Sequence, residues 1–594
     1  MRHRWFACLL LLLPANLAAQ QSSEPADLVL LNAKVWTVEE KQPVAEAVAI
    51  RGNRIIKVGS AADVAPFVRE GYTRVLDLRG RLVLPGFIDN HTHFAQAGRL
   101  LLGLNLLEVN DAENFRARVA AAADRLPPGA WLVGGDWGAY AEWEKDARGQ
   151  KSPDTEGTET QRAQRRKEFL PAKELIDAAT ADHPALISRF DGQLHLANSL
   201  ALAAAGITRD TSSPEGGEIL RDAAGEPSGL LRGTAAQLVR KVVPPASYEQ
   251  RRAEALHALE EARRWGVTTI HDNTANFEQL DLFRDVHRAG ELTSRVWARM
   301  PLSDWEKVRE HIREKNLART TGGWGDEYIQ LGGLKAWVDG IMGNSTALFW
   351  EPYRHQPGEY GRLRPVMHPE GNLHRLIRAA DLAGFTVTVH AIGDYANHLL
   401  LDTYERVFRE NPARDRRFRV VHAQVLDPMD FPRFGKLKLV AEVQPYHCID
   451  DMRWMEERIG DRARWSYAFL SLANSGAMMS FGSDWPGTNA SYYPNNLLLG
   501  IYAAVTRQTL KGQPEGGWFR GQRISMEDAV RYFTLNNAWA TFEENLKGSI
   551  KKGKLADLVV LDRDIFSRPP RELLDTQVLF TILDGRIVYE KPGR

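Results

Sequence analysis

Cysteine is almost absent from this chain, which contains only Cys8 and Cys448 among its 594 residues. Cys8 lies in an N-terminal segment that we expect to be removed, which would leave Cys448 alone in the mature chain. A single cysteine excludes an intrachain disulfide, so the fold must be stabilised by other means. Free cysteine is usually a buried packing residue, and we interpret Cys448 in that way rather than as a nucleophile.

The sequence also lacks a net charge and a membrane-length apolar run. Lys and Arg number 76, as do Asp and Glu, so the formal net charge at pH 7 is zero. This balance indicates neither a basic surface for nucleic acid nor an acidic tail. No segment reaches the roughly 20 apolar residues of a transmembrane helix. With 44% hydrophobic and 26% charged residues, the composition is that of an ordinary globular protein.

The N-terminal segment is typical of a secretory signal peptide. Arg2 and Arg4 precede a short apolar run from Trp5 to Pro14, and mostly small residues follow up to Ala19. A basic start, a short apolar core and a small-residue cleavage site are the three parts of such a signal. We therefore expect residues 1–19 to be cleaved and the protein to be exported, to the bacterial periplasm or the extracellular space.

Both ends of the remaining chain are rich in short β-type segments. Near the N-terminus these are residues 28–38, 47–58 and 74–78, with Gly52-Asn53 where a hairpin turn would place them. Near the C-terminus they are residues 556–562, 578–583 and 586–589. The simplest arrangement is one small β-domain built from residues 20–84 and 541–594, flanking a larger domain of residues 85–540.

Eight apolar, β-prone segments alternate with helix-length segments in that larger domain. One helical segment begins with Ser247-Tyr248-Glu249-Gln250, which fits a capping box. Eight strands separated by helices predict an α/β fold of the (β/α)₈ TIM-barrel type, with its active site at the carboxyl ends of the strands. The predicted strands are residues 83–93, 267–272, 294–300, 333–339, 386–390, 418–422, 439–444 and 478–484.

A long insertion, residues 94–245, separates the first predicted strand from the second. It contains the polar run Glu142–Glu168, with a basic stretch from Arg162 to Lys167. We interpret this stretch as a solvated loop, because a nucleic-acid site needs a wider basic surface. An insertion on the catalytic rim of a barrel is expected to cover the pocket.

Two histidines end the first predicted strand. His91 and His93 are separated by one residue, and side chains on a strand alternate between its two faces. Both imidazoles therefore point the same way and can bind one ion, since imidazole is a common zinc ligand. This pair alone is weak evidence for a metal site, because two histidines at a strand end also occur by chance.

Polar residues also mark the ends of other predicted strands. His390 ends the fifth strand, His422 the sixth and Asp484 the eighth, while Lys335 lies within the apolar fourth strand. Alone, each histidine has an ordinary structural explanation, and Asp484 would cap a turn. Lys335 is less ordinary, since a buried ammonium is costly unless it is paired or modified. The set as a whole predicts a metal site.

These motifs resemble the amidohydrolase superfamily of metal-dependent hydrolases and, within it, the amidohydrolase-3, YtcJ-like branch. The resemblance runs from about residue 28 to the C-terminus. It implies a distorted (β/α)₈ barrel beside a β-sandwich made from both termini. The matching stretches are Pro85–His93, Gly266–Asp272, Lys335 with Asp339-Gly340, His390–Asp394, His422–Gln424, Gln444–His447, Phe481–Asp484 and Gly548–Leu558.

The resemblance also implies two divalent metal ions, most simply zinc. His91, His93 and Asp484 would bind the more buried ion, and His390 and His422 the second. Lys335, carboxylated by carbon dioxide, would bridge both ions as a carbamate, which would also resolve the cost of burying an ammonium.

The same resemblance implies the reaction. A water shared by both ions would have its pKa lowered from about 16 towards about 7 and would attack as hydroxide. Asp484 would take the proton and pass it to the leaving nitrogen. The expected substrate is a small amide, such as an N-acyl or N-formyl compound, and the bond broken is a C–N bond other than a peptide bond.

The sequence departs from the branch where substrate contacts are expected. Gln193 stands where many relatives have histidine, Val421 where many have glutamate, and Trp485 where a small residue is usual. Substrate specificity therefore cannot be carried over. For the candidate substrate-binding residues, structural roles are equally open; these residues are Gln193, His195, His271, His447 and Trp485.

Two other functions stay open on the sequence. A mononuclear deaminase-type member of the superfamily would not need Lys335 and usually carries a glutamate near the fifth-strand histidine, whereas Ala-Ile-Gly-Asp follows His390. A periplasmic binding protein or pseudo-enzyme on the same barrel would be recognised by a missing ligand, and none is missing. The expected partners are the small-molecule amide substrate and, as an open option, a second copy of the chain in a homodimer.

Overall fold

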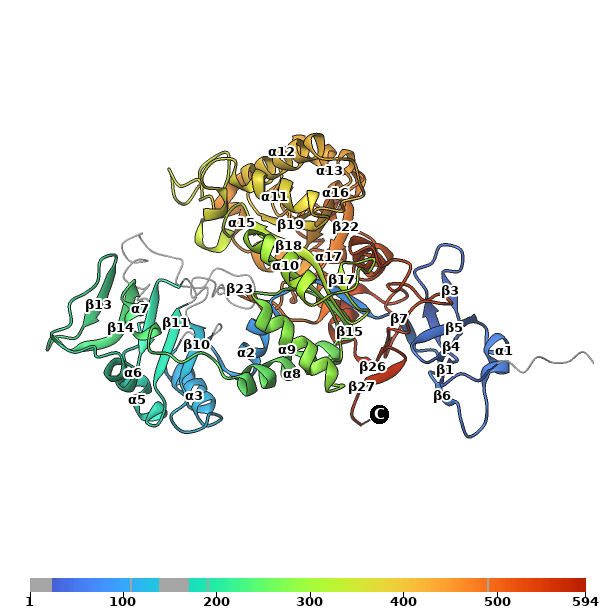
Figure 1. The fold of residues 1–594 in the computed structure, drawn as a ribbon, viewed down its shortest axis with the longest axis horizontal. Coiled ribbons are helices and arrows are strands. Elements are labelled where there is room, and N and C mark those ends of the chain that lie inside the picture. The colour runs from blue at the N-terminus through green and yellow to red at the C-terminus, as the bar shows by residue number, and fades with distance from the viewer. Residues whose placement is uncertain are drawn as a thin grey trace, which may run out of the picture.

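The structure is a computed structural model that describes residues 24–106, 109, 111–137, 170–189, 192–488 and 491–593. The expected signal peptide and the polar run Glu142–Glu168 lie outside these residues, so both stay predictions. Figure 1 shows a central barrel between a β-rich domain on one side and the inserted segment on the other. Among the helices of the described residues, none has the length and apolar character needed to cross a bilayer.

The centre of the molecule is a nearly closed parallel barrel, which confirms the predicted fold class. Its strands are arranged around the barrel in the order of the sequence, and each pairs in parallel with the next. Between the first and last strands the connection is a single bridge from Thr92 to Trp485. The strands are β8 (Phe87–Thr92), β15 (Val267–Asn273), β16 (Arg295–Pro301), β18 (Ile329–Trp337), β19 (Thr386–Ala391), β20 (Arg419–His422), β21 (Val440–Val443) and β22 (Met478–Phe481).

The predicted segment 83–93 is split between two strands, one of them in the β-rich domain, and the last strand ends earlier than predicted. We expected it to reach Asp484, but β22 ends at Phe481 and Asp484 lies in the turn that follows. The backbone of Asp484 is left-handed, with φ of 60°, which a strand residue cannot adopt. The aspartate is thus presented from a turn and not from a strand end.

Helices alternate with the barrel strands. The first of them, α8, begins as predicted, because the Ser247 hydroxyl accepts a hydrogen bond from the backbone nitrogen of Gln250. Its buried face contributes Ala255, Leu259 and Ala262 to the main hydrophobic core. The principal helices are α8 (Tyr248–Arg264), α9 (Phe277–Arg288), α10 (Trp305–Glu314), α11 (Asn372–Leu382), α12 (Asp394–Glu410), α13 (Phe431–Lys436), α14 (Pro445–Asp451), α16 (Phe469–Asn474), α17 (Leu497–Thr506), α18 (Met526–Tyr532) and α19 (Leu535–Ala540).

The two ends of the chain meet in one β-sandwich, as expected. Strand β7 (Leu82–Pro85) pairs in antiparallel fashion with β25 (Leu558–Leu561), and a shared core joins the two sheets. One sheet has the order β5 (Arg54–Gly59), β4 (Ala47–Arg51), β1 (Leu28–Leu31), β6 (Arg74–Asp77). The other has the order β27 (Arg586–Glu590), β26 (Val578–Leu583), β25, β7, β2 (Lys34–Trp36), β3 (Val44–Ala45).

From Leu104 on, the described part of the insertion builds its own sheet and its own hydrophobic cores, whereas α2 (Phe94–Leu102) at its start contributes Phe94 and Ala97 to the main core. Whether the insertion covers the pocket stays a prediction. Its sheet has the order β13 (Gly217–Arg221), β14 (Pro227–Gly233), β12 (Leu194–Ala197), β11 (Ala185–Arg189), β10 (Leu132–Trp137), β9 (Leu104–Asn105). Its helices are α2 (Phe94–Leu102), α3 (Ala112–Ala123), α5 (Glu174–Asp177), α6 (Ser199–Ala204) and α7 (Ala236–Arg240).

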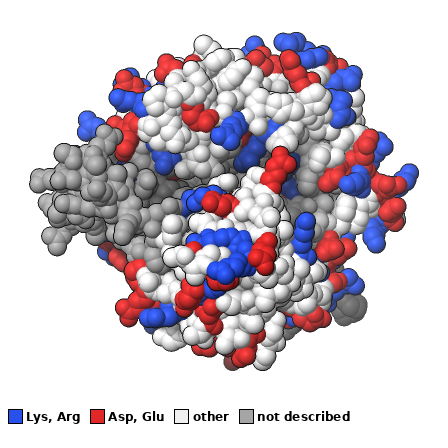
Figure 2. Space-filling view, turned by 90° about the vertical axis from the view of Figure 1, so that its left-hand side faces the viewer, with Lys and Arg blue, Asp and Glu red and all other residues white. Residues whose placement is uncertain are grey.

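Acidic and basic side chains are interspersed on the face drawn in Figure 2. No broad basic area stands out there among the described residues. This distribution is in keeping with the zero formal charge of the sequence, and the absence of a nucleic-acid partner stays a prediction.

Candidate metal centre

The predicted ligands occupy the carboxyl end of the barrel. His91 lies in β8, and His93 is the first residue after that strand, just before α2. Lys335 is near the end of β18, His390 lies in β19 and His422 is the last residue of β20. Parallel strands present their carboxyl ends on one side of a barrel, so the sequence brings these side chains to a common place.

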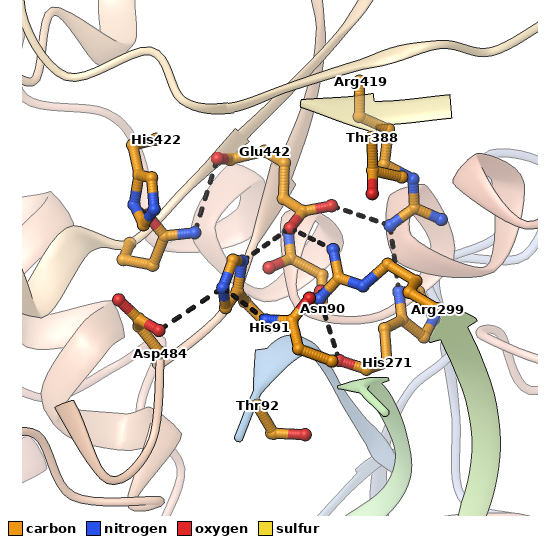
Figure 3. Close-up of polar contacts among 12 residues, drawn as sticks. Asn90, His91, Thr92, His271, Arg299, Thr388, Arg419, His422, Glu442 and Asp484 are labelled. Carbon is orange, nitrogen blue, oxygen red and sulfur yellow. Dashed lines mark hydrogen bonds and ion pairs between the residues drawn. The ribbon is translucent and has the colours of Figure 1, made fainter. Parts of the chain in front are cut away.

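His91, His93 and Asp484 form the first candidate ligand group. Nε2 of each histidine lies 3.4 Å from Oδ1 of Asp484, and one ligand atom from each of the three residues lies within 4.8 Å of the others. Figure 3 shows His91 and Asp484 facing each other. Two imidazoles and a carboxylate are a donor set that zinc accepts.

A second candidate group shares Asp484 with the first. It contains His422 and His447, and Nε2 of His447 lies 3.5 Å from Oδ2 of Asp484. We expected His390 beside His422, and their rings are indeed close, with centroids 4.5 Å apart. Nε2 of His390, however, donates a hydrogen bond to the carbonyl of Gly340 at 2.9 Å, so only its Nδ1 is left for an ion. His447, a candidate substrate-binding residue on the sequence, also lies at ligand distance from Asp484.

Hydrogen bonds fix which nitrogen of the two central histidines faces the site. Nδ1 of His91 lies 2.8 Å from Oε1 of Glu442, and Nδ1 of His422 lies 2.7 Å from Oε1 of Gln444. Both oxygens are acceptors, so each Nδ1 carries the hydrogen. The lone pair of each imidazole is therefore on Nε2, as metal binding requires.

The turn that carries Asp484 is tied to the strand that carries His91. Asp89 accepts hydrogen bonds from the backbone nitrogen of Ser483 at 2.9 Å and from the side chain of Asn495 at 2.8 Å. The Ser483 hydroxyl also donates to Asp89. His422 has a left-handed backbone as well, with φ of 73°. Such conformations are costly for residues other than glycine and persist where the surroundings hold them, often at functional sites.

Lys335 is buried and its ammonium has no hydrogen-bond partner among the residues that the structure describes. Nζ lies 5.5 Å from the centre of the Trp337 ring. Burial, with the charge of Arg299, lowers the pKa of Lys335 to about 7. At neutral pH a large fraction of this amine is therefore neutral and nucleophilic, which is the state that reacts with carbon dioxide.

Three histidines of the site, His91, His390 and His422, are held neutral. Burial lowers the pKa of His390 to about 3 and holds the pKa of His91 and of His422 well below its usual value. A positive charge on Lys335 lowers the pKa of His91 and His390 further. Neutral imidazole is the form that binds a metal, so these groups need lose no proton at neutral pH.

The remaining candidate substrate residues lie in different surroundings. His271 is buried inside the barrel, where its Nδ1 accepts a hydrogen bond from Arg419 at 3.1 Å. His195 belongs to the insertion, where it contacts the Ser188 hydroxyl at 3.1 Å, and Gln193 is exposed just before it. Trp485 is fully buried. Trp485 directly follows Asp484 in the chain, and its backbone carbonyl accepts a hydrogen bond from the backbone nitrogen of His93 at 2.8 Å.

Sequence reasoning missed a buried ionic network beneath the ligands. Glu442 lies in β21 between Arg299 of β16 and Arg419 of β20, with N–O distances of 2.7 and 2.9 Å. Burial raises the pKa of Glu442, but the two arginines outweigh burial and lower it to about 2. The available signal was a charged residue inside each of three apolar strands, the same signal that drew attention to Lys335.

The fold and the site together define a class, that of hydrolases built on a (β/α)₈ barrel with metal-ligand residues at its carboxyl end. The chain belongs to the amidohydrolase family, whose model matches residues 74–589. This confirms the family expected from the motifs. As a member, the protein is a hydrolase that acts on C–N bonds.

Three relatives and one solved structure are similar along nearly the whole chain. Protein LONG AFTER FAR-RED 3 of Arabidopsis thaliana is 36% identical, covering 95% of this chain and 92% of its own. Putative amidohydrolase YtcJ of Bacillus subtilis (strain 168) is 29% identical, covering 94% and 98%. N-substituted formamide deformylase of Arthrobacter pascens is 26% identical, covering 96% and 99%. An uncharacterized metal-dependent hydrolase from Pyrococcus horikoshii OT3 shares the fold, with a TM-score of 0.70 at 23% identity over 91% of this chain and 99% of its own.

Proposed function

We propose that the protein is an exported, binuclear metal-dependent amidohydrolase that cleaves a small, non-peptide amide. The observation that carries this proposal is the pair of candidate ligand groups that share Asp484. Two groups with one common carboxylate fit two neighbouring ions better than one. The unpartnered amine of Lys335, buried at the same end of the barrel, supplies a group that can be converted into a bridge.

The residues present fit two divalent ions, most simply zinc. His91 and His93 would hold one ion and His422 the other, with His447 or His390 beside it, while Asp484 is within reach of both groups. Lys335 would join them as a carbamate: its neutral amine adds to the carbon of carbon dioxide and one proton leaves the nitrogen. This modification turns an isolated buried cation into an anion that metal ions would pair.

When bound, such ions supply Lewis acidity, which lowers the pKa of water and polarises a carbonyl. The protein's own contribution is proton transfer and positioning. The Asp484 carboxylate accepts the proton of the attacking water and returns it to the leaving nitrogen. The tie from Asp89 to Ser483 holds the turn that places Asp484. The lowered pKa of His91 and His422 keeps these imidazoles from taking up the proton.

The proposed substrate is an N-acyl or N-formyl compound. A relative with nearly complete coverage of both chains is named N-substituted formamide deformylase, which supports a small amide as the substrate. The mononuclear, deaminase-type alternative is supported by the hydrogen bond between His390 and Gly340, because it occupies one nitrogen of an expected ligand of the second ion.

Elemental analysis of active, purified protein tests the number of ions. We expect close to two divalent ions per chain, together with hydrolysis in a screen of N-formyl amines, N-acyl amides, cyclic amides and esters. One ion per chain in fully active protein would favour the mononuclear alternative. Absence of any ion would refute the proposal.

Export is tested separately. The basic and apolar start of the sequence supports a cleaved signal, so N-terminal sequencing of secreted protein should begin near Gln20. Mature protein that begins at Met1 would contradict export while leaving the catalytic proposal intact.

A further inference from the structure

Glu442 lies at the centre of the buried network beneath the ligands, as Figure 3 shows. Its Oε1 lies 2.7 Å from a guanidinium nitrogen of Arg299 and 2.8 Å from Nδ1 of His91. Its Oε2 lies 2.9 Å from a guanidinium nitrogen of Arg419. The side chains of Glu442, Arg299 and Arg419 are fully buried.

The two arginines are themselves fixed to the barrel backbone. Arg299 donates to the carbonyls of Asn90 and His271, each at 3.0 Å, and Arg419 donates to the carbonyl of Ala540 at 3.1 Å. Arg299 thus anchors Glu442 to the strand that carries His91. The carboxylate is held in place before any ligand is bound, which is the condition for orienting another group.

Chemistry decides the direction of the contact with His91. A guanidinium is a donor and cannot accept, so both oxygens of Glu442 already act as acceptors of ionic hydrogen bonds. The third contact, to Nδ1 of His91, must also be one in which Glu442 accepts. Nδ1 of His91 therefore carries the hydrogen, and Nε2, which faces Asp484 and His93, has the lone pair.

We propose that Glu442 is a positioning residue for the metal centre: it selects the tautomer and fixes the ring orientation of His91, so that Nε2 is ready to bind an ion. This proposal rests on the proposed metal function for its consequence, but not for the tautomer itself. Partners of this kind raise metal affinity because the ligand needs no rearrangement when the ion arrives. The two arginines hold the Glu442 carboxylate in place, and Arg299 also donates to the carbonyl of Asn90, the residue before His91.

Substitution Glu442→Gln tests the idea. A glutamine amide has one acceptor oxygen and one donor nitrogen, whereas the three neighbours of this position all donate. We expect the affinity for Zn²⁺, measured by competition with a chelator, to fall by about 10–100-fold, the usual effect of losing such a partner.

Asp381→Asn is the matched control. Asp381 is a buried carboxylate that also lies between two arginines, with N–O distances of 2.7 Å to Arg414 and 3.0 Å to Arg416. It belongs to α11 on the outside of the barrel and bonds to none of the candidate ligands. This variant should lose stability in the same way and keep its Zn²⁺ affinity. An equal loss of affinity in both variants would show that Glu442 is only structural.

The tautomer is read directly in metal-free protein with ¹⁵N-labelled histidine, using His91→Asn to assign the signal. Wild type should show His91 protonated on Nδ1 only, and Glu442→Gln should show a mixture with the Nε2-protonated form. If Glu442→Gln does not fold, Glu442→Asp is the second variant, because its shorter side chain keeps the negative charge but moves the carboxylate away from His91. Zn²⁺ affinity and the His91 tautomer are then measured on this variant. An unchanged Nδ1 form would overturn the proposal. Wild type that binds no Zn²⁺ would refute the proposed function, while the tautomer measurement would still decide the role of Glu442.

Discussion

Two buried cations on neighbouring barrel strands, Arg295 and Lys335, show how differently the two ends of the barrel are built. Arg295 begins β16 and is bonded to Asp557 at 2.7 and 3.0 Å and to Asp584 at 2.8 Å. Lys335, at the other end, has no hydrogen-bond partner among the described residues. Burial disfavours both charges, but the carboxylates more than compensate at Arg295 and raise its pKa, whereas the pKa of Lys335 falls to about 7.

The difference distinguishes a cation that stabilises the fold from one whose amine is available for reaction. Arg295 joins the amino end of the barrel to the C-terminal strands, and its charge is neutralised within the protein. The unpaired, buried amine of Lys335 contributes nothing to the stability of the fold, which is expected of a group retained for its reactivity.

The largest effect is expected from Asp484→Asn. Asparagine keeps the shape and one oxygen ligand but cannot accept the proton, so bound metal should be largely retained while turnover falls by about 10²–10⁴-fold. Single-turnover hydrolysis and elemental analysis on the same preparation measure both quantities. Turnover within about threefold of wild type, with metal fully bound, would exclude Asp484 as the proton-transfer group.

Lys335→Ala should remove the bridge, one of two ions and most of the activity. Short carboxylic acids should restore part of it, because they can occupy the place of the carbamate. Lys335→Arg should not restore activity, since a guanidinium stays protonated and cannot react with carbon dioxide. The measurement is hydrolysis with and without added acid. Full activity of Lys335→Ala would contradict the bridging role.

The contrast between the cations is tested by replacing each with methionine in metal-free protein. Arg295→Met leaves two buried carboxylates without their partner and should lower the free energy of unfolding by about 3–5 kcal/mol. Lys335→Met removes an unpaired buried charge and should leave stability unchanged or raise it. Urea unfolding of both variants measures the difference. Equal destabilisation would mean that Lys335 is a structural residue like Arg295.

The smallest effect concerns Asp451, a buried carboxylate that accepts hydrogen bonds from Gln424 and Tyr467. Burial, with the charge of Asp450, raises the pKa of Asp451 to about 8. Its contribution to stability is therefore fully present below about pH 4, the pKa of an unfolded aspartate, and is lost as the pH rises to about 8. Asp451→Asn should flatten the fall of the melting temperature over this range. An unchanged pH profile would show that Asp451 does not titrate there.

The barrel could be predicted from sequence because each of its strands is a short apolar run, as in Thr386–Ala391, and most of these runs are separated by helix-length segments. The candidate ligands could be proposed because they stand near the carboxyl ends of those strands, as His91 and His422 do. Both inferences need only local sequence and the rule that parallel strands share a carboxyl end.

Other features depend on contacts that local sequence does not specify. Glu442 meets Arg299 and Arg419 across three strands, so the network appears only when the strand register is known. His447 reaches Asp484 because helix α14 starts immediately after β21. The left-handed backbone of Asp484 depends on Asp89, which is far away in the chain and holds the preceding serine.

The pairing of β7 with β25 has a consequence for the order in which the molecule can be completed. One residue, Gly86, separates β7 from β8, so the strand that carries His91 is held at its start by a strand near the opposite end of the chain. Pairings between such distant segments form late, because a long loop must close first. During synthesis, β25 is made after all the candidate ligands, so the metal centre is completed only after β25 has been made. A chain truncated before Leu558 should therefore lose the metal centre as well.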